Sequence, residues 1–599
     1  MAKITRRDFL RISALTASTL VVSTAITGCS GGGNDTAFSL DFWNTIDVEF
    51  NHGVASGDPT TNSVILWTRI TPLSDIDTVN LFYQVSEDED FTTIVRSGNI
   101  TTKKERDYTV KIDLQDLEEN KIYYYRFKSN EKTSIIGKTK TISSNPSEVK
   151  MAVFSCSNYP NGYFNAYMEA SKMQLDVALH LGDYIYEYGM YENDDGVTPA
   201  YATKNAIAIG RELPRDNNTE LLTLEDYRKR YALYRTDIGS LALHQNLPVI
   251  TVWDDHEIAN DTYKDGAENH DSSEGEFDLR KEHALQAYFE WLPIRPFEDN
   301  NNEIIYRNFE FGNLVNLYML DTRVLGRDKQ LSYSDYFDNL GNFDSTTFTQ
   351  DLIDSSRTML GSEQLVWLQN SLSNSTATWQ VLGQQVLMGK MFLPAELLTM
   401  IAQLDSDITD AQKLVILTNL NTAITELIAI KTRILANDTT LTAAEKARVE
   451  TTLPYNLDAW DGYFYEREVI LGTSKALGKN LVVLAGDTHN SWASEIKDQA
   501  GDLVGVEYAV TSVTSPGMED YAGLTNLTTA QNFEAALTFL IDDLKYTNLN
   551  QRGFMVVSFT SQEVNTTWYY VDNYDSTTYS LDQTREKSLK TLVNTNTIS

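Results

Sequence analysis

The chain has 599 residues, 42% of them hydrophobic, and carries 84 acidic against 49 basic residues for a formal net charge of −35. This length predicts more than one domain, and the hydrophobic content suits globular cores but is too low for a multispan membrane protein. The acidic balance argues against nucleic-acid binding, and a site for an anionic substrate would need local positive charge from metal ions or a few arginines.

The first 29 residues have the pattern of an export signal. An arginine pair at 6–7 precedes an apolar stretch at 12–26 that is too short and too polar to span a membrane, and a lipobox-like Ile-Thr-Gly-Cys ends at Cys29. We expect residues 1–29 to direct export through the twin-arginine machinery to the periplasm or cell surface, with a lipid anchor at Cys29. Residues 30–47, which begin with Ser and Gly, are expected to form a flexible tether to the membrane.

Short segments of alternating polar and apolar residues fill residues 48–145, separated by turn signals such as Ser-Gly-Asp-Pro at 56–59. The predicted strands lie at 64–69, 80–85, 108–112 and 122–127. Strands at this spacing over ~100 residues predict a small two-sheet β-sandwich of immunoglobulin or fibronectin type.

From residue 148 to 575 strands alternate with long segments, which is typical of a layered α/β domain. The core strands are predicted at 151–154, 177–179, 249–253, 314–320, 379–382 and 481–484, with a hairpin at 554–559 and 567–571. Ser362 is expected to cap an amphipathic helix. Residues 576–599 are assigned as a C-terminal tail.

An insertion at 394–450 interrupts this domain. Its apolar residues follow helical spacing, and Thr442-Ala443-Ala444-Glu445 is a capping-box pattern. The segment predicts a helical hairpin, which is either a lid or a peripheral structural insertion.

Four apolar runs of this domain end in groups that bind metals or transfer protons. They lead to Cys156, to Asp183, to the Asp-Asp-His-Glu sequence at 254–257 and to the Gly-Asp-Thr-His sequence at 486–489. Because parallel strands of an α/β sheet deliver such residues to one edge, we expect a single shared metal site.

Two unlike metals fit the residue types at these strand ends. A carboxylate, a phenolate, a thiolate and an imidazole favour ferric iron over zinc, because several anionic ligands offset a triple charge. The candidates for this iron site are Asp183, Tyr186, Cys156 and His489. All-oxygen donors favour Ca²⁺ or Mg²⁺, and the candidates for this second site are Asp255, Asp487, Asn260, Gln384 and the shared Asp183.

Two metals that share Asp183 would orient and deprotonate a water while neutralising phosphate charge. His256, beside Asp255, is then the candidate acid for the leaving alkoxide. Arg323, directly after a predicted strand, is a candidate ligand of the substrate phosphate, and ordinary pairing with Asp or Glu is the alternative. The same two interpretations apply to Arg228, Arg230 and Arg235.

These motifs together resemble the PhoD-type alkaline phosphatases of the calcineurin-like metallophosphoesterase superfamily. The matching pieces, in chain order, are 52–59, Cys156, 182–187, 253–257, 320–323, 460–463, 486–489 and 511–517. The resemblance implies a β-sandwich followed by a catalytic α/β sandwich. It also implies phosphomonoesterase and phosphodiesterase activity at alkaline pH with one iron and one or more calcium ions, although zinc or magnesium is not excluded.

The wider superfamily supplies a metal ligand and a catalytic His from a Gly-Asn-His-Glu motif. Residues 254–257 match this motif, which implies that Asp255 is a ligand and His256 the acid. The closing Gly-His-x-His motif matches 486–489, where Asp487 replaces a His and supports an oxygen-rich second site. Cys156 stands in place of the opening Asp-x-His, as in this subgroup, and the insertion at 394–450 has no counterpart that we can map.

The expected function is therefore that of an exported, monomeric alkaline phosphatase or phosphodiesterase acting on small or polymeric phosphate esters. One alternative is a phospholipase D-like or wall-polymer phosphodiesterase. Another is a noncatalytic, metal-containing surface binding protein, against which His256 argues because a structural metal site needs no proton donor.

Overall fold

The computed structural model describes residues 47–191, 197–296, 301–338, 343–404, 409–524 and 526–599. The predicted export signal, with its arginine pair and Cys29, lies outside these residues, as does all of the predicted tether except Asp47.

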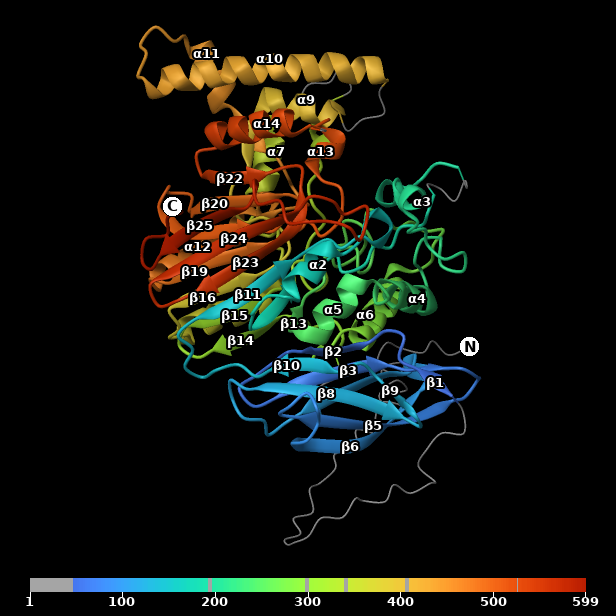
Figure 1. Ribbon diagram of the computed structural model, residues 1–599. Helices are drawn as coiled ribbons and strands as arrows, with labels where there is room; N and C mark the ends of the chain where they lie inside the picture. The colour runs from blue at the N-terminus through green and yellow to red at the C-terminus, as the bar shows by residue number, and fades with distance from the viewer. Residues whose placement is uncertain (1–46, 192–196, 297–300, 339–342, 405–408, 525) are drawn as a thin grey trace, which may run out of the picture. The chain divides into compact units, whose positions relative to one another are not determined.

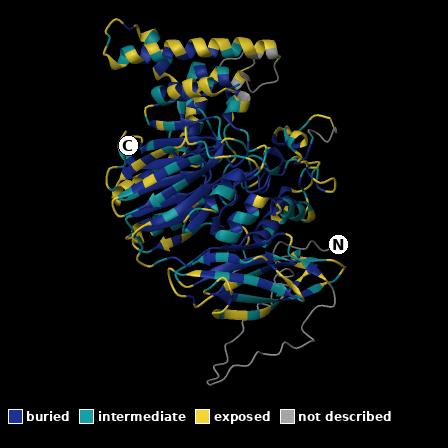
Figure 2. Cartoon of the chain, in the orientation of Figure 1, coloured by how far each residue is buried: buried dark blue, intermediate teal, exposed yellow. Residues whose placement is uncertain are grey.

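A nine-stranded sheet has the order β25-β24-β23-β11-β12-β13-β2-β3-β7 (Figure 1). In chain order its strands are β2 (Val54–Gly57), β3 (Val64–Arg69), β7 (Thr109–Leu114), β11 (Val149–Phe154), β12 (Val177–His180), β13 (Pro248–Thr251), β23 (Arg552–Phe559), β24 (Glu563–Val571) and β25 (Lys587–Leu592). β11, β12 and β13 run parallel. β12 and β13 are buried along their whole length (Figure 2), which explains why they are apolar runs rather than alternating sequences.

A seven-stranded sheet has the order β14-β15-β16-β19-β21-β20-β22. Its strands are β14 (Arg307–Phe311), β15 (Val315–Met319), β16 (Trp379–Gly383), β19 (Asn480–Ala485), β20 (Ser491–Lys497), β21 (Leu503–Ala509) and β22 (Leu544–Asn548). β15, β16, β19 and β21 run parallel. The two sheets pack on each other, since Trp568 of β24 lies in edge contact with Tyr508 of β21, with ring centroids 5.9 Å apart, and donates to the carbonyl of Ala509.

Helices cover both sheets and complete a layered α/β architecture. Those that contribute to the core of the nine-stranded sheet are α2 (Asn165–Ala170), α4 (Leu224–Tyr234), α5 (Ile238–Asn246) and α6 (Phe277–Trp291). Those that contribute to the core beside the seven-stranded sheet are α8 (Gly361–Asn374), α12 (Phe464–Ala476) and α14 (Leu527–Leu540). Short helices in the connections are α3 (Ala206–Ile209), α7 (Ser345–Leu352) and α13 (Met518–Tyr521).

The N-terminal β-sandwich shares one of its sheets with the catalytic part of the chain. Its second sheet has the order β10-β8-β5-β6, with β9 beside β8. These strands are β5 (Thr78–Ser86), β6 (Ile94–Lys103), β8 (Ile122–Ser129), β9 (Lys132–Thr133) and β10 (Gly137–Lys140), and a separate pair is β1 (Val48–Glu49) with β4 (Thr71–Pro72). The opposing sheet of the sandwich is β2-β3-β7, and β2 pairs in parallel with β13, so the sandwich and the central sheet are continuous.

The insertion forms helices on a two-stranded stalk. β17 (Phe392–Pro394) pairs antiparallel with β18 (Thr452–Pro454), and α9 (Ala395–Leu404), α10 (Asp410–Leu435) and α11 (Ala443–Glu450) lie between them. α10 packs along α9 and α14 (Figure 1). Its segment Leu414–Leu435 is long and apolar enough to cross a membrane by length and composition alone, but Leu420 and Leu427 of this segment are buried in the protein core.

The structure confirms one predicted helix cap, contradicts another and adds a strand near the C-terminus. The capping box at Thr442 and Glu445 is confirmed at the start of α11. The cap assigned to Ser362 is wrong, because α8 begins one residue earlier, at Gly361, and Ser362 lies inside the helix. The segment 576–599, assigned only as a tail, contributes β25, which pairs with β24.

Candidate metal centre

The parallel strands of both sheets end at the same edge, which brings distant parts of the chain together. Cys156 follows β11 and Asp183 follows β12, and the Cys156 N–H donates to the carbonyl of Gly182 at 3.2 Å. The N–H of Val513, beyond β21 of the other sheet, donates to the carbonyl of Ser155 at 2.9 Å. The expected gathering of strand ends therefore occurs.

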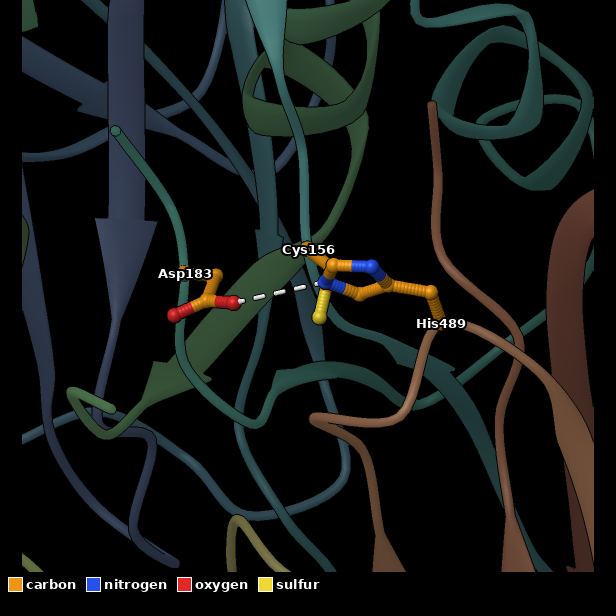
Figure 3. A group of neighbouring side chains, drawn as sticks. All are labelled: Cys156, Asp183 and His489. Atoms are coloured by element: carbon orange, nitrogen blue, oxygen red, sulfur yellow. Dashed lines mark ion pairs between the residues drawn. The ribbon is translucent and has the colours of Figure 1, made fainter. Parts of the chain in front are cut away.

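One group of donor atoms contains Cys156, Asp183 and His489. The Cys156 sulfur, an Asp183 carboxylate oxygen and a His489 ring nitrogen lie within 4.8 Å of one another (Figure 3). The Tyr186 hydroxyl donates to Asp183 Oδ2 at 3.0 Å and lies 3.1 Å from His489 Nε2. All four residues predicted for the iron site are thus neighbours.

A second group contains Asp183, Asp255 and His256, whose donor atoms also lie within 4.8 Å of one another. Asp183 belongs to both groups. Its Oδ1 is buried and has no hydrogen-bond partner among the described residues. A buried carboxylate oxygen without a partner is costly unless it binds a cation or a proton, so Asp183 has the position and the free donor atom of a bridging ligand.

Four candidate residues adopt left-handed backbone conformations although none is glycine. The φ angles are 60° at Cys156, 55° at Asp183, 63° at Asp487 and 61° at His489. Such conformations are strained for residues with a Cβ and cluster at functional sites. Next to Asp183, a Cβ on Gly182 (φ 105°) would lie 2.3 Å from Asp254 Cβ, so this position requires glycine.

Burial favours the protonated forms of the acidic donors of the iron group in the absence of a cation. Burial, followed by the charge of Asp183, raises the pKa of the Cys156 thiol and of the Tyr186 hydroxyl well above their usual values. Burial also raises the pKa of Asp183 to about 7. Binding a cation here would therefore release protons, as metal sites with anionic ligands do.

His489 is suited to bind a metal through Nε2. Burial lowers its pKa to about 3, so the imidazole is neutral. Its Nδ1 lies 2.5 Å from the carbonyl of Pro516, which requires the proton on Nδ1 and leaves the lone pair on Nε2.

Whereas the His489 imidazole is neutral, the surroundings of His256 favour its protonated, positively charged form. Burial lowers its pKa, but the carboxylates of Asp255, Glu187 and Asp183 outweigh burial and raise the pKa well above its usual value. His256 Nδ1 lies 2.8 Å from Glu187 Oε2, and Glu187 also accepts from the Asn260 backbone N–H at 2.8 Å. A buried imidazolium fixed in this way can donate a proton.

Arg323 is fully buried and links carboxylates from separate segments. Its Nε donates to Asp254 at 2.5 Å and its NH1 to Asp458 at 2.8 Å. Its NH2 is held more loosely, 3.4 Å from Asp487 Oδ1 and 3.9 Å from Asp255 Oδ2. Asp255 and Asp487, predicted for the second metal, therefore lie on either side of one guanidinium nitrogen.

The side-chain amides of Gln384 and Asn260, the other two candidates for the second metal site, are hydrogen-bonded to other residues. Gln384 accepts from Trp460 Nε1 at 3.0 Å and donates to the carbonyl of Val386, so both ends of its amide already have partners. The Asn260 side chain donates to Glu268 at 2.8 Å.

The other three arginine candidates make structural contacts. Arg228 pairs with Glu290 at 2.6 Å. Arg230 is buried and donates to backbone carbonyls, among them that of Tyr188 at 3.0 Å. Arg235 donates to the carbonyls of His52 and Val54 and so supports the shared sheet.

Sequence reasoning missed five residues of the site. They are Glu187, Asp254, Glu257, Asp458 and Ser515. Glu257 accepts from the backbone N–H groups of Asp183 at 3.1 Å and Asp254 at 2.8 Å and fixes the two strand ends relative to each other. Four of the five lie inside or next to motifs noted in the sequence, but only the fold shows which charges they meet.

The donor set fits a metal centre. Thiol, phenol, imidazole and carboxylate groups converge on Asp183, and the buried oxygens Asp183 Oδ1 and Asp254 Oδ2 have no hydrogen-bond partner among the described residues. This grouping suggests that the protein binds metal ions here.

Comparisons with known proteins agree along most of the chain. The family model of the PhoD-like phosphatases matches residues 151–568, and that of the PhoD-like phosphatase N-terminal domain matches residues 37–143. The chain is 34% identical over 488 residues to alkaline phosphatase D of Bacillus subtilis (strain 168), which covers 78% of this chain and 70% of that protein. A solved structure of PhoD superposes with a TM-score of 0.69 at 28% identity, covering 92% of this chain and 91% of the PhoD chain.

Proposed function

Because this chain belongs to the PhoD-like phosphatase family, we propose that it is an exported, metal-dependent alkaline phosphatase that cleaves phosphate monoesters and diesters. Family membership makes it a phosphatase. The proposal adds the two-metal site, the diesterase activity and export through the twin-arginine route with a lipid anchor at Cys29.

The position of Asp183 carries the proposal, because its carboxylate lies within 4.8 Å of donor atoms of Cys156 and His489 on one side of the site and of Asp255, beside the acid His256, on the other. Asp183 with Cys156, Tyr186 and His489 would hold ferric iron, whereas Asp183 with Asp255 and Asp487 would hold calcium. When bound, the two cations would neutralise the charge of the phosphate and favour deprotonation of the attacking water.

His256 supplies the proton for the leaving group in this mechanism. The carboxylates of Asp255, Glu187 and Asp183 raise the pKa of His256 and so favour its protonated form, and Glu187 at Nδ1 fixes its orientation and stabilises the imidazolium. The Nε2–H remains to donate to the leaving oxygen. The NH2 group of Arg323, which lies 3.4 Å and 3.9 Å from its carboxylate neighbours, is the part of the guanidinium left to donate to a phosphate oxygen, while Nε and NH1 keep the group in place.

The test is hydrolysis by purified protein at alkaline pH of p-nitrophenyl phosphate and bis-p-nitrophenyl phosphate. Both activities should disappear on chelation and return when iron and calcium are restored, and metal analysis should find both elements. Absence of either activity in metal-replete protein would remove the corresponding half of the proposal. A strong preference for diesters would favour a phospholipid or wall-polymer substrate.

A further inference from the structure

A polar segment at 511–516, here called the strap, lies against the metal-site candidates. It follows β21, and its sequence is Thr-Ser-Val-Thr-Ser-Pro. Its hydroxyl-bearing residues Thr511, Ser512, Thr514 and Ser515 are completely buried. Buried hydroxyl groups must be hydrogen-bonded, so their partners show what the strap supports.

The strap contacts three of the four residues of the iron group. Ser515 Oγ lies 2.6 Å from the Tyr186 hydroxyl and 3.1 Å from the carbonyl of Cys156. The carbonyl of Pro516 accepts from His489 Nδ1. The hydroxyl of Thr511 lies 3.0 Å from the backbone carbonyl of His489 and 2.6 Å from that of Gln551, so its proton goes mainly to Gln551. One short segment therefore fixes side-chain or backbone atoms of Cys156, Tyr186 and His489.

Ser515 acts directly on a donor atom. The Tyr186 hydroxyl donates its own proton to Asp183 Oδ2, so its oxygen is the acceptor for Ser515. Ser515 has one hydroxyl proton, and its contact with Tyr186 is shorter than that with the Cys156 carbonyl. The resulting chain of hydrogen bonds runs from Ser515 to Tyr186 to Asp183.

We propose that Ser515 is a positioning residue for the metal centre, whose hydroxyl holds the Tyr186 oxygen in place and withdraws charge from it once that oxygen binds the cation. The proposal rests on the metal site of the proposed function. On binding, Tyr186 would release one proton to solvent and bind as a phenolate, and the Ser515 hydrogen bond would persist because Ser515 is the donor. A hydrogen bond to a ligand atom orients it and tunes the metal.

The first test is the visible spectrum of iron-loaded protein. Phenolate bound to ferric iron absorbs by ligand-to-metal charge transfer, and Tyr186→Phe should lose this contribution. Ser515→Ala removes the donor, leaves more charge on the phenolate and should shift the band to longer wavelength. Thr514→Val is the matched control, because it removes a buried hydroxyl of the same strap whose partners are the backbone groups of Asn158. Its band should not move.

The second test is metal affinity, measured by competition with a chelator, which does not require the metal to be iron. Ser515→Ala should weaken binding by roughly 10–100-fold and Thr514→Val much less. In the Tyr186→Phe background Ser515→Ala should have little further effect, because its partner is gone. Ser515→Cys keeps a weak hydrogen-bond donor of similar size. If the alanine variant does not fold, the cysteine variant should show a loss of affinity between those of the parent protein and of a variant without the donor.

Equal spectra and equal affinities for Ser515→Ala and Thr514→Val would overturn the proposal and leave the strap with a purely structural role. A phosphatase assay separates this outcome from failure of the proposed function. Loss of affinity in Ser515→Ala without any phosphatase activity in the parent protein would retain the role of Ser515 and reject the enzyme.

Discussion

At the residue scale, the strained backbone of the metal-site candidates is a feature that cannot be predicted from the sequence. Left-handed φ angles at Cys156, Asp183, Asp487 and His489 cost about 1–3 kcal/mol each. Such strain persists only where surrounding contacts fix the conformation, and the strap and Glu257 provide such contacts. The donors are therefore held in position by the fold before a cation binds.

His256→Ala should lower kcat by ~10²–10⁴-fold while metal content stays near that of the parent protein. The reason is that His256 is assigned as the acid, and its Nδ1 is engaged by Glu187 rather than by a metal. The loss should be smaller for p-nitrophenyl phosphate than for an alkyl phosphate, because a good leaving group needs little protonation. Equal losses on both substrates would argue that His256 has another role.

Metal-free protein should become less stable as pH rises from about 4 to about 8. Asp183 has a folded pKa of about 7 against an ordinary value of 3.8, and Asp261, raised by burial and by the charges of Asp458 and Asp255, has a pKa of about 8. The folded state therefore binds protons that the unfolded state releases, and this stabilisation is lost as pH rises through those values.

The measurement is thermal unfolding in chelator across this pH range, with metal-loaded protein beside it. Asp183→Asn, which is neutral at every pH, should flatten the dependence. A melting temperature of the metal-free protein that does not fall with pH would contradict the assignment.

Much of the site could be predicted because strand ends are visible in a sequence. Apolar runs that stop at Cys156, Asp183 and Asp487 locate the edge of the sheets without any structure. Asp458 and Ser515 could not be found in this way, because their importance comes from Arg323 and Tyr186, which are distant in the chain. Gln384 shows the limit of the same reasoning, since its residue type and its place at a strand end do not reveal that its amide is hydrogen-bonded by Trp460 and Val386.

At the scale of elements, the shared sheet decides which parts of the chain are separable. β2 lies between β13 and β3, and the indole of Trp67 in β3 donates to the carbonyl of Glu290 in α6 at 2.8 Å. The edge of the central sheet would be exposed without these strands. The insertion, by contrast, meets the rest of the protein through a two-stranded stalk and one face of α9 and α10.

Two deletions of similar kind should therefore differ in outcome. Removing residues 47–145 should give aggregated or unfolded protein, because β13 loses its neighbour. Removing residues 395–451, with a short glycine link between Pro394 and Thr452, should leave a folded protein that still binds metal. Solubility, circular dichroism and metal content are the measurements, and a soluble, metal-binding product of the first deletion would contradict the argument.

Three of the strands that the sequence failed to predict, β6, β20 and β22, share a physical cause. β6 is mostly exposed, and β20 and β22 mix charged and small polar residues with a few apolar ones, so none has a strong apolar period. Their neighbours in the sheet, rather than their own propensities, determine that they are strands. The pairing of β2 with β13 could not be predicted either, because pairing between strands that are distant in the chain leaves no local sequence pattern.

At the scale of the whole molecule, we propose that the chain is exported and anchored outside the cytoplasm. The residues that would achieve this, the arginine pair at 6–7 and Cys29, precede the described part of the chain. Cys29→Ala should release the protein from the membrane in soluble, active form. Changing both arginines to lysine should retain it in the cytoplasm, as measured by fractionation and immunoblotting. Membrane attachment of Cys29→Ala as strong as that of the parent would refute the anchor.

The stalk has an evolutionary consequence. Because Phe392 pairs with Pro454 and Pro394 with Thr452, the insertion leaves and re-enters the domain at neighbouring points. Ancestors could gain, lose or exchange the helices between them in one genetic event without shifting a single strand of the catalytic sheets. Yet Asp458, four residues beyond the stalk, binds Arg323. A change in the insertion could therefore alter the position of Asp458 and, through Arg323, the rate of the reaction. We expect the insertion to vary in length among homologues, whereas the strand ends around the site keep their positions.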